Sequence, residues 1–326
     1  MATSGDTTFS VSRNDIIAEA MQICGVLGKG ATPDSNALTD WGRSLNILVK
    51  SLNARPGMNL WAIERLVMFP VKNQIEYSFG ASGDRMCKTS ELIETELDGA
   101  HSSGATTLTV TGKDGTTGMA NSDVIGVQTD SGGISWTTIS GSPTSTTIPL
   151  ASGISAAASS GNNVYTYTTV FAQNVLKVHD MWRRTDDGTD VPIELLSRQD
   201  YIYLSDKDSA GPVTSAYYDP QLGTGKLSVW QVPDDSYTSE LLYLRASRRF
   251  EDFDSATDTP DFPQEWYLPL VFNLALNRAS ASGLTGGEFR EVATLASQYL
   301  MEVLDFDVEP QSIYIVPDNE FNTYGL

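Results

Sequence analysis

The chain has 326 residues and a formal net charge of −20 at pH 7, from 41 Asp and Glu against 21 Lys and Arg. A chain of this length can bury a full hydrophobic core and corresponds to about one to three domains. The acidity argues against a protein that grips nucleic acid by neutralising phosphates, although it suits a surface along which DNA slides without sticking.

Residue types that carry chemistry are scarce. Cys24 and Cys87 are too few for a disulfide framework or a thiolate metal cage, and two histidines, His101 and His179, cannot make a His-rich metal site. No run of about 18 apolar residues predicts a membrane span. The opening MATSGDTTFSVS lacks the basic start and apolar core of a signal peptide. We therefore expect a soluble protein made in the cytosol.

Two helices are predicted near the N-terminus. Ser12 and Asp15 have the spacing of a capping box, and apolar residues follow at helical intervals up to a glycine-rich stretch. A second helix starts near Asp34, and its apolar stripe includes Trp41 and Leu45. Both helices are interpreted as core elements rather than as ligand-binding ones.

The middle of the chain changes character twice. Leu60–Tyr77 has short apolar runs that indicate two strands and a turn. Between Gly99 and Thr168, 37 of 70 residues are Ser, Thr or Gly, and β-type runs alternate with Gly- or Ser-rich turns. We interpret residues 99–168 as a small inserted all-β module, with a disordered Ser/Thr linker as the alternative.

Strand patterns continue after the module. Asn174–Trp182 is a predicted strand, Arg183–Asp190 a charged hairpin turn, and Ser197 with Asp200 the cap of a short helix. Three further segments alternate in the manner of antiparallel strands: Val213–Tyr218, Lys226–Val232 and Ser239–Arg245.

A helical hairpin near the C-terminus is the predicted packing centre. Asp261–Gly283 is apolar on most sides, which predicts a helix buried on several faces. Its predicted packing residues, in the core or against a neighbouring subunit, are Trp266, Leu270, Phe272 and Leu274. Pro269 leaves two possibilities, a separate first turn or a helix that begins near Leu268. Thr285 and Glu288 have capping-box spacing for a second, amphipathic helix.

No catalytic, cofactor or metal site is predicted. The glycine-rich turns lack a nucleophile elbow, and Gly25-x-x-Gly28-x-Gly30 lacks the Lys-Ser/Thr of a phosphate loop. An acidic loop is the best candidate for a hard cation, but without the central Gly and final Glu of a calcium loop it is interpreted as solvated. Its acids are Glu251, Asp252, Asp254, Asp258 and Asp261.

Two short arginine clusters are flanked by acids, which favours salt bridges over DNA binding. The bridges are expected within the chain or to a neighbouring subunit. The arginines concerned are Arg183, Arg184, Arg248 and Arg249.

Together these features predict an α+β fold with a helical core of about four helices, antiparallel β-strands and an inserted small all-β module. The expected divisions are 1–98, with the N-terminal helix pair and first strands; 99–168, the β module; 169–309, the remaining strands and the helical hairpin; and 310–326, an extended C-terminal arm.

The order of features is more informative than any one motif. The N-terminal helix pair carries NDIIAEAMQICGVLG and DWGRSLNILVKSLNARPGMNLWAIER. The β-rich middle carries LLSRQDYIYLSDKDSAGPVTSAYYD and KLSVWQVPDDSYTSELLYLR, followed by DFPQEWYLPLVFNLALNRAS, a last helix and a tail. This set resembles the head-to-tail adaptor family of tailed bacteriophages, of the tail accessory or head-completion type found in short-tailed phages. The resemblance covers most of residues 9–326 apart from the module.

The resemblance implies a non-enzymatic ring of twelve subunits beneath the portal, at the head–tail junction of a virion assembled in the bacterial cytoplasm. Such a ring completes the head, helps retain packaged DNA, and carries the tail nozzle or tail tube proteins. Double-stranded DNA passes its channel without specific binding, because carboxylates repel phosphates. The implied portal-docking arm has the anchors Ile313, Tyr314, Ile315, Phe321 and Tyr324.

Two other functions remain open from the sequence. The β module could recognise a glycan or a cell-surface receptor, with Trp136, Tyr165 and Tyr167 as stacking groups. A carboxylate-based hydrolase is the weakest interpretation, because nothing selects a catalytic pair among the 41 acids.

Overall fold

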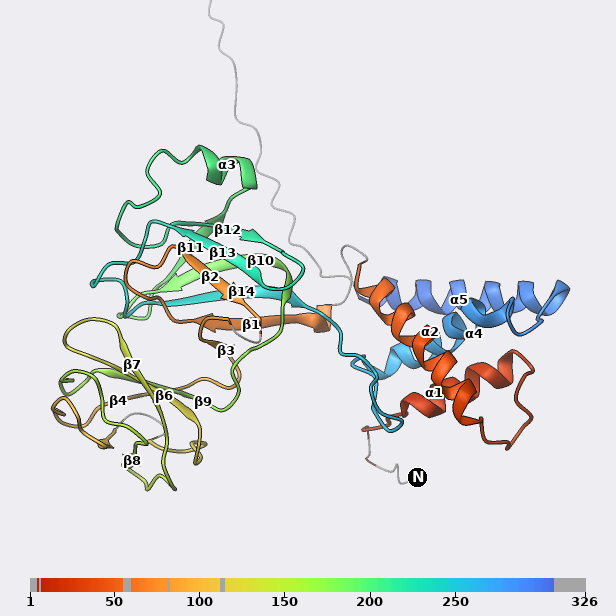
Figure 1. The fold of residues 1–326 in the computed structure, drawn as a ribbon, viewed down its shortest axis with the longest axis horizontal. Coiled ribbons are helices and arrows are strands. Elements are labelled where there is room, and N and C mark those ends of the chain that lie inside the picture. Colours follow the sequence, from red (N-terminus) through yellow and green to blue (C-terminus); the bar gives the residue numbers. More distant parts are fainter. Residues whose placement is uncertain (1–4, 6, 55–59, 81–82, 112–114, 308–326) are drawn as a thin grey trace, which may run out of the picture. The chain divides into compact units, whose positions relative to one another are not determined.

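The computed structural model describes residues 5, 7–54, 60–80, 83–111 and 115–307. The chain divides into two compact units (Figure 1). The first, here the helical unit, combines Met1–Trp61 with Phe250–Leu326, and the second, the β unit, is Ala62–Arg249. The β unit is thus an insertion between two chain ends that fold together.

Strands dominate the fold, which corrects the predicted fold class. The described residues form fourteen strands and only five α-helices, so a four-helix core with a small β module was wrong. Strands such as β3 (Met86–Lys88) and β4 (Ile93–Glu96) are three and four residues long. Segments this short carry almost no periodicity, and their partners lie far away in sequence.

Side-chain caps start two of the helices of the helical unit, α1 and α2. The bounds are α1 Arg13–Ile23, α2 Ser35–Asn53, the 3-10 helix η2 Gln264–Trp266, α4 Tyr267–Ala279 and α5 Gly286–Phe306. The capping box before α1 is confirmed, since Ser12 N–H donates to the Asp15 carboxylate (2.9 Å) and Asp15 N–H to the Ser12 hydroxyl (3.3 Å). Asp34 caps α2 through two backbone N–H groups. The box predicted at Thr285 was wrong: α5 begins there without a side-chain cap.

Helix α4 is the centre of the helical unit and packs against α1, α2 and α5. The separate short element, one of the two predicted possibilities, is the helix η2, which comes directly before α4. Pro269 lies in the first turn of α4, where a missing N–H leaves no intrahelical hydrogen bond unmade. Phe272 is only partly buried, because its ring lies at the outer edge of the α4–α5 contact, T-shaped to Tyr299 at 5.0 Å. Five of the predicted packing residues are buried: Trp41, Leu45, Trp266, Leu270 and Leu274.

An eight-stranded sheet forms most of the β unit, in the order β2-β13-β12-β11-β10-β14-β1-β3. The bounds are β1 Ile63–Met68, β2 Glu76–Phe79, β3 Met86–Lys88, β10 Val175–Arg184, β11 Asp190–Leu195, β12 Ser215–Asp219, β13 Gly225–Trp230 and β14 Leu241–Arg248. Every pair is antiparallel except β11 and β12. A parallel pair needs a crossover, and α3 (Arg198–Tyr203) lies in it, capped by Ser197 and Asp200 as predicted.

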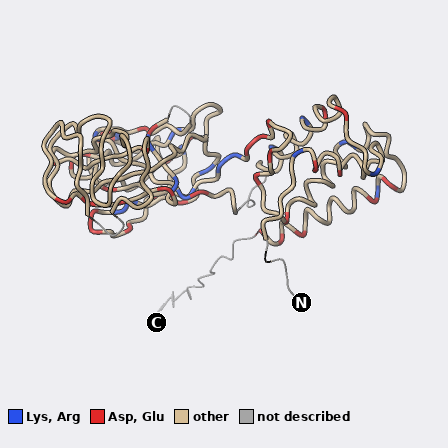
Figure 2. The backbone as a smooth tube through the Cα atoms, turned by 90° about the horizontal axis from the view of Figure 1, so that it is seen from below, with Lys and Arg blue, Asp and Glu red and all other residues tan. Residues whose placement is uncertain are grey.

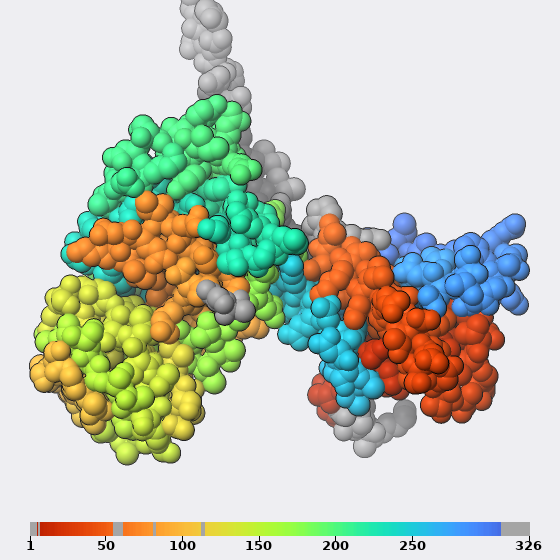
Figure 3. Space-filling model, in the orientation of Figure 1, coloured from red at the N-terminus to blue at the C-terminus, as the bar shows by residue number. Residues whose placement is uncertain are grey.

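The Ser/Thr-rich stretch is folded, as the β interpretation predicted. Its strands are β5 Thr107–Thr109, β6 Val124–Gln128, β7 Ile134–Thr138, β8 Thr147–Pro149 and β9 Asn163–Tyr167. A four-stranded sheet, β4-β9-β6-β7, encloses an apolar core with the β5–β8 pair. Since β4 precedes Gly99, this sheet begins before the predicted module boundary. Figure 3 shows its yellow atoms against the orange and green ones of the large sheet.

Both cysteines are buried, and we expect their thiols to be inert. Burial raises the pKa of Cys87 to about 12. The Cys24 thiol donates to the Ala275 carbonyl (3.3 Å), and burial raises its pKa too. In the folded protein each thiol should react with a maleimide at least about a hundredfold more slowly than an exposed cysteine, because the thiolate is the nucleophile. Intact-mass measurement before and after denaturation checks this, and rapid labelling of the folded chain would contradict it.

Candidate functional site

The aromatic residues proposed to stack on a glycan pack between two sheets instead. Tyr165 and Tyr167 are 3% and 1% exposed, and the Phe69 ring lies 5.6 and 5.9 Å from theirs. Trp136 is half-buried, edge-on to Phe69 at 4.7 Å. A Cβ at Gly126 would lie 2.6 Å from the Trp136 ring, so only glycine leaves room for it. These rings attach the four-stranded sheet to the eight-stranded one, which removes the stacking groups of a glycan site.

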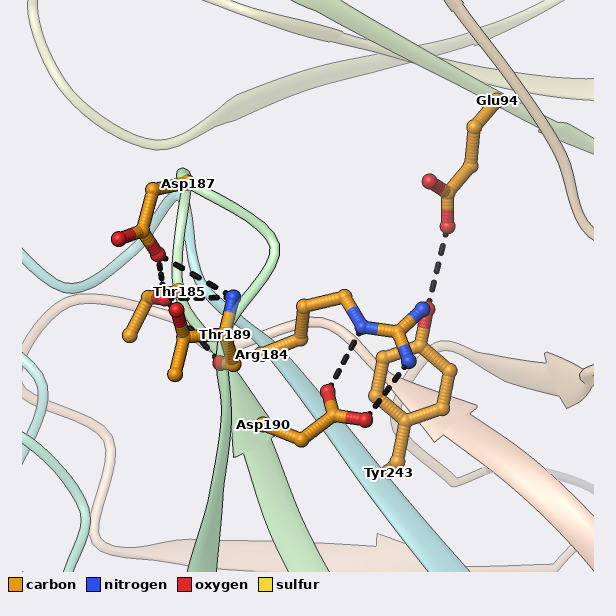
Figure 4. A network of polar contacts seen from close by, with 7 residues as sticks. All are labelled: Glu94, Arg184, Thr185, Asp187, Thr189, Asp190 and Tyr243. Atoms are coloured by element: carbon orange, nitrogen blue, oxygen red, sulfur yellow. Dashed lines mark hydrogen bonds and ion pairs between the residues drawn. The ribbon is translucent and has the colours of Figure 1, made fainter.

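A polar network holds the same two sheets together (Figure 4). Arg184 on β10 makes two hydrogen bonds to Asp190 on β11 (2.8 and 3.0 Å), which hold the pKa of Asp190 below its ordinary value. Its guanidinium also lies 4.5 Å above the Tyr243 ring and donates to the Tyr243 hydroxyl (3.3 Å). That hydroxyl donates to Glu94 on β4 (3.2 Å). The network therefore runs from the large sheet to the smaller one.

We expect Tyr243→Phe to weaken this attachment by about 1 kcal/mol, the net worth of a hydrogen bond. The ring keeps its stacking on Trp182 (5.6 Å), whereas the hydroxyl's hydrogen bonds to Glu94 and from Arg184 are lost. Hydrogen exchange of the β4 and β9 amides checks the effect. The matched control is Tyr217→Phe. Tyr217 lies on β12 of the same sheet, and its ring stacks on Tyr201 of α3 (5.7 Å). Equal exchange in the two variants would contradict a role for the Tyr243 hydroxyl.

Salt bridges were expected within the chain or to a neighbouring subunit for four arginines, and three of the four have partners within the chain. Arg183 and Arg184 pair with Glu240 and Asp190, and Arg248 pairs with Glu64 (3.1 Å). For Arg249 no ion pair is present among the described residues. Neighbouring strands place the acids opposite the arginines, an arrangement that a single sequence does not reveal. The three intramolecular ion pairs join neighbouring strands of the eight-stranded sheet.

The acidic loop uses its carboxylates for its own turns. Asp258 accepts backbone N–H groups from Asp254 (2.8 Å) and Ser255 (2.5 Å), and Asp252 pairs with Lys50 (2.8 Å). Among the described residues no group of three His, Cys, Asp or Glu side chains is arranged to hold a metal ion. The contacts of Asp258 and Asp252 thus form a turn of the loop and connect the loop to α2.

One side of α5 is exposed on the surface of the helical unit. Only Val292, Ala296, Leu300 and Val303 on this helix are buried hydrophobics, a single stripe that packs on α4 and η2. The opposite side forms a shallow hollow, and we define the outer face of α5 as Thr294, Ser297, Gln298, Met301, Glu302 and Asp305. Met301 is 66% exposed. An apolar side chain at the centre of a polar rim is the pattern of a protein contact surface.

That surface was not among the predicted site residues. The apolar stripe of α5 predicts one buried side. On the other side a single methionine among polar residues is only a weak sequence signal for a contact surface. The predicted arm anchors, Ile313, Tyr314, Ile315, Phe321 and Tyr324, lie outside the described residues.

Each histidine ring contacts a residue that carries a hydroxyl group. The His101 ring accepts from the Thr109 N–H (3.2 Å), and the His179 ring lies 2.6 Å from the Ser247 hydroxyl. No helix in the described ranges is long and apolar enough to cross a membrane. No protein-family model matches the chain, and neither does any curated protein.

Proposed function

We propose that the chain is a structural head-to-tail adaptor subunit of a tailed-phage virion. In this proposal it forms a homo-oligomeric ring under the portal, completes the filled head, helps retain the DNA and seats the tail. The ring lines the channel through which the DNA passes. The proposed role is structural rather than enzymatic. The protein would be assembled in the host cytoplasm and would lie at the head–tail junction of the virion.

The observation that carries the proposal is the helical unit built from both chain ends. Two of the sequence blocks that carry the resemblance, around α1–α2 and α4–α5, fold against each other although about two hundred residues separate them. The β unit, which contains the extra module 99–168, lies between them in the sequence. The outer face of α5, which is exposed among the described residues, supplies a surface for a neighbouring subunit.

The charge distribution supports a passive DNA channel. Acidic positions are spread over both units rather than gathered in one cluster (Figure 2). A chain with a net charge of −20 gains no affinity for DNA by releasing phosphate counterions, so the duplex can pass without being held.

Electron microscopy of the purified chain mixed with the portal of its phage tests this function. We expect a closed ring beneath the portal. The triple change Ile313→Ser, Tyr314→Ser and Ile315→Ser should abolish portal binding, whereas Val71→Ser, an exposed apolar position in the β unit, should not. A chain that stays monomeric and never joins the portal would overturn the proposal.

A further inference from the structure

The outer face of α5 can be covered by protein at little cost. The hydroxyls of Thr294 and Ser297 donate to carbonyl oxygens one turn back, those of Arg290 (2.8 Å) and Ala293 (2.9 Å). No unpaired hydroxyl donor would therefore be left when water is displaced. The short side chains also allow close approach of another helix, with Met301 as the protruding apolar group.

Helix α2 presents a second exposed face. It has an apolar side chain, Ile47, next to a basic one, Arg43. Ile47 is 64% exposed, and Arg43 lies one turn before it with its side chain 72% exposed. The nearest acid to Arg43 is Asp40 at 4.0 Å, a contact too long and too exposed to hold the guanidinium. On α5, the acids Glu302 and Asp305 follow Met301. The acidic α5 face therefore complements the basic Arg43 on α2, and each face has an exposed apolar residue, Met301 or Ile47.

We infer that the outer face of α5 on one copy docks on the Arg43–Ile47 face of α2 on a second copy of this chain. Met301 packs against Ile47, and Asp305 pairs with Arg43. This inference deepens the proposed ring and rests on it, because it names the two subunit faces that would meet.

The packing of the helical unit makes such a contact head-to-tail. Within the described part of the chain, α2 packs on α1 and α4, whereas α5 packs on α4 and η2. The two faces are therefore separate surfaces, and a subunit that offers α5 to one neighbour still has α2 free for another. Heterologous contacts of this kind close into rings when the rotation between subunits allows it.

Cysteine cross-linking tests the pairing directly. Chains with Met301→Cys and chains with Ile47→Cys, distinguished by tags, are mixed and oxidised; the buried Cys24 and Cys87 stay silent. We expect mixed dimers in at least about tenfold excess over a control pair of Met301→Cys with Ile202→Cys, an exposed position on α3. A mixed yield no higher than the control, or a predominance of Met301→Cys homodimers, would overturn the inference.

Charge reversal gives a second readout in solution. Arg43→Glu and Asp305→Lys should each weaken self-association about tenfold, measured by sedimentation velocity, and the double variant should recover most of the loss. Arg65→Glu, on an exposed position of β1, is the matched control and should leave self-association unchanged. Single and double variants that associate like the unmodified chain would contradict the Arg43–Asp305 pair.

The two failures can be told apart. If rings form on the portal in the Arg43→Glu, Asp305→Lys and Ile47→Asp variants, the proposed function stands and the α2–α5 contact is wrong. If the cross-links form as expected but the chain never binds the portal, the contact stands and the adaptor function is wrong. A chain that neither self-associates nor cross-links overturns the contact.

Discussion

Replacing Trp266 by alanine is expected to destabilise the helical unit by about 3–5 kcal/mol, the usual cost of removing a buried tryptophan. Trp266 is 2% exposed and lies at the start of α4, where its ring contacts Trp61 (4.9 Å) and Phe262 (5.5 Å). Trp61 in turn stacks on Phe250 (5.8 Å). Trp61 and Phe250 are where the chain leaves and re-enters the helical unit, so the cluster holds its two halves together.

The measurement must resolve the two units, because a chain of two units need not unfold in a single transition. Hydrogen exchange of the α1 and α4 amides in graded denaturant does so, with the β14 amides as an internal reference. Exchange should accelerate in the helices of Trp266→Ala and stay unchanged in β14. Phe306→Ala, which removes an aromatic ring that is 81% exposed, is the matched control and should change stability by less than about 0.5 kcal/mol. Unchanged exchange in α4 would show that the aromatic cluster is not the centre of the unit.

Arg183→Met is expected to destabilise the β unit by about 3 kcal/mol at neutral pH, because it strands a buried carboxylate. Arg183 donates from Nη1 to both oxygens of Glu240 (2.7 and 2.8 Å), and the two side chains are 15% and 10% exposed. Burial already raises the pKa of Glu240 above its ordinary value of 4.5, even with Arg183 opposing it. Without the guanidinium the pKa should rise further.

The pH dependence gives this prediction a sign. A carboxyl group with a raised folded-state pKa contributes its full stability below the unfolded-state pKa and loses it as the pH rises through the folded-state pKa. The penalty of Arg183→Met should therefore be large at pH 7 and shrink as the pH falls toward 4.5. Urea unfolding at several pH values measures it. Adding Glu240→Gln should restore most of the stability at neutral pH, whereas a pH-independent loss would point to packing instead.

Short sequence patterns predicted the features of the structure that depend on neighbouring residues, such as helix starts and apolar stripes. Side-chain caps start α1 and α2 at Ser12 and Asp34, and each cap acts within three residues of itself. The apolar stripe of α2 has the period of a helix, and its predicted members Trp41 and Leu45 lie on one buried side. The short, regularly spaced β-type runs of the inserted stretch likewise predicted strands rather than a linker.

Long-range pairing was not predictable in the same way. The β1 strand pairs with β14, and Tyr243 of β14 reaches Glu94 of β4, although more than a hundred residues separate each pair. Nothing near Trp136 in the sequence indicates that Phe69 covers its ring. The same holds for the arginines, since Arg183 and Glu240 meet only because β10 and β14 are neighbours in the sheet.

The sequence by itself determined where helices begin, which stripes on them are apolar, and that the middle of the chain is built of strands, because these properties depend on a few consecutive residues. Only the tertiary structure decided that strands outweigh helices, that the aromatic residues of the insertion join two sheets, and that three arginines are paired within the chain. It also decided which side of α5 is buried against α4 and which side is exposed among the described residues. Those outcomes depend on which distant segments become neighbours, and a single sequence leaves that choice to the packing of the whole chain.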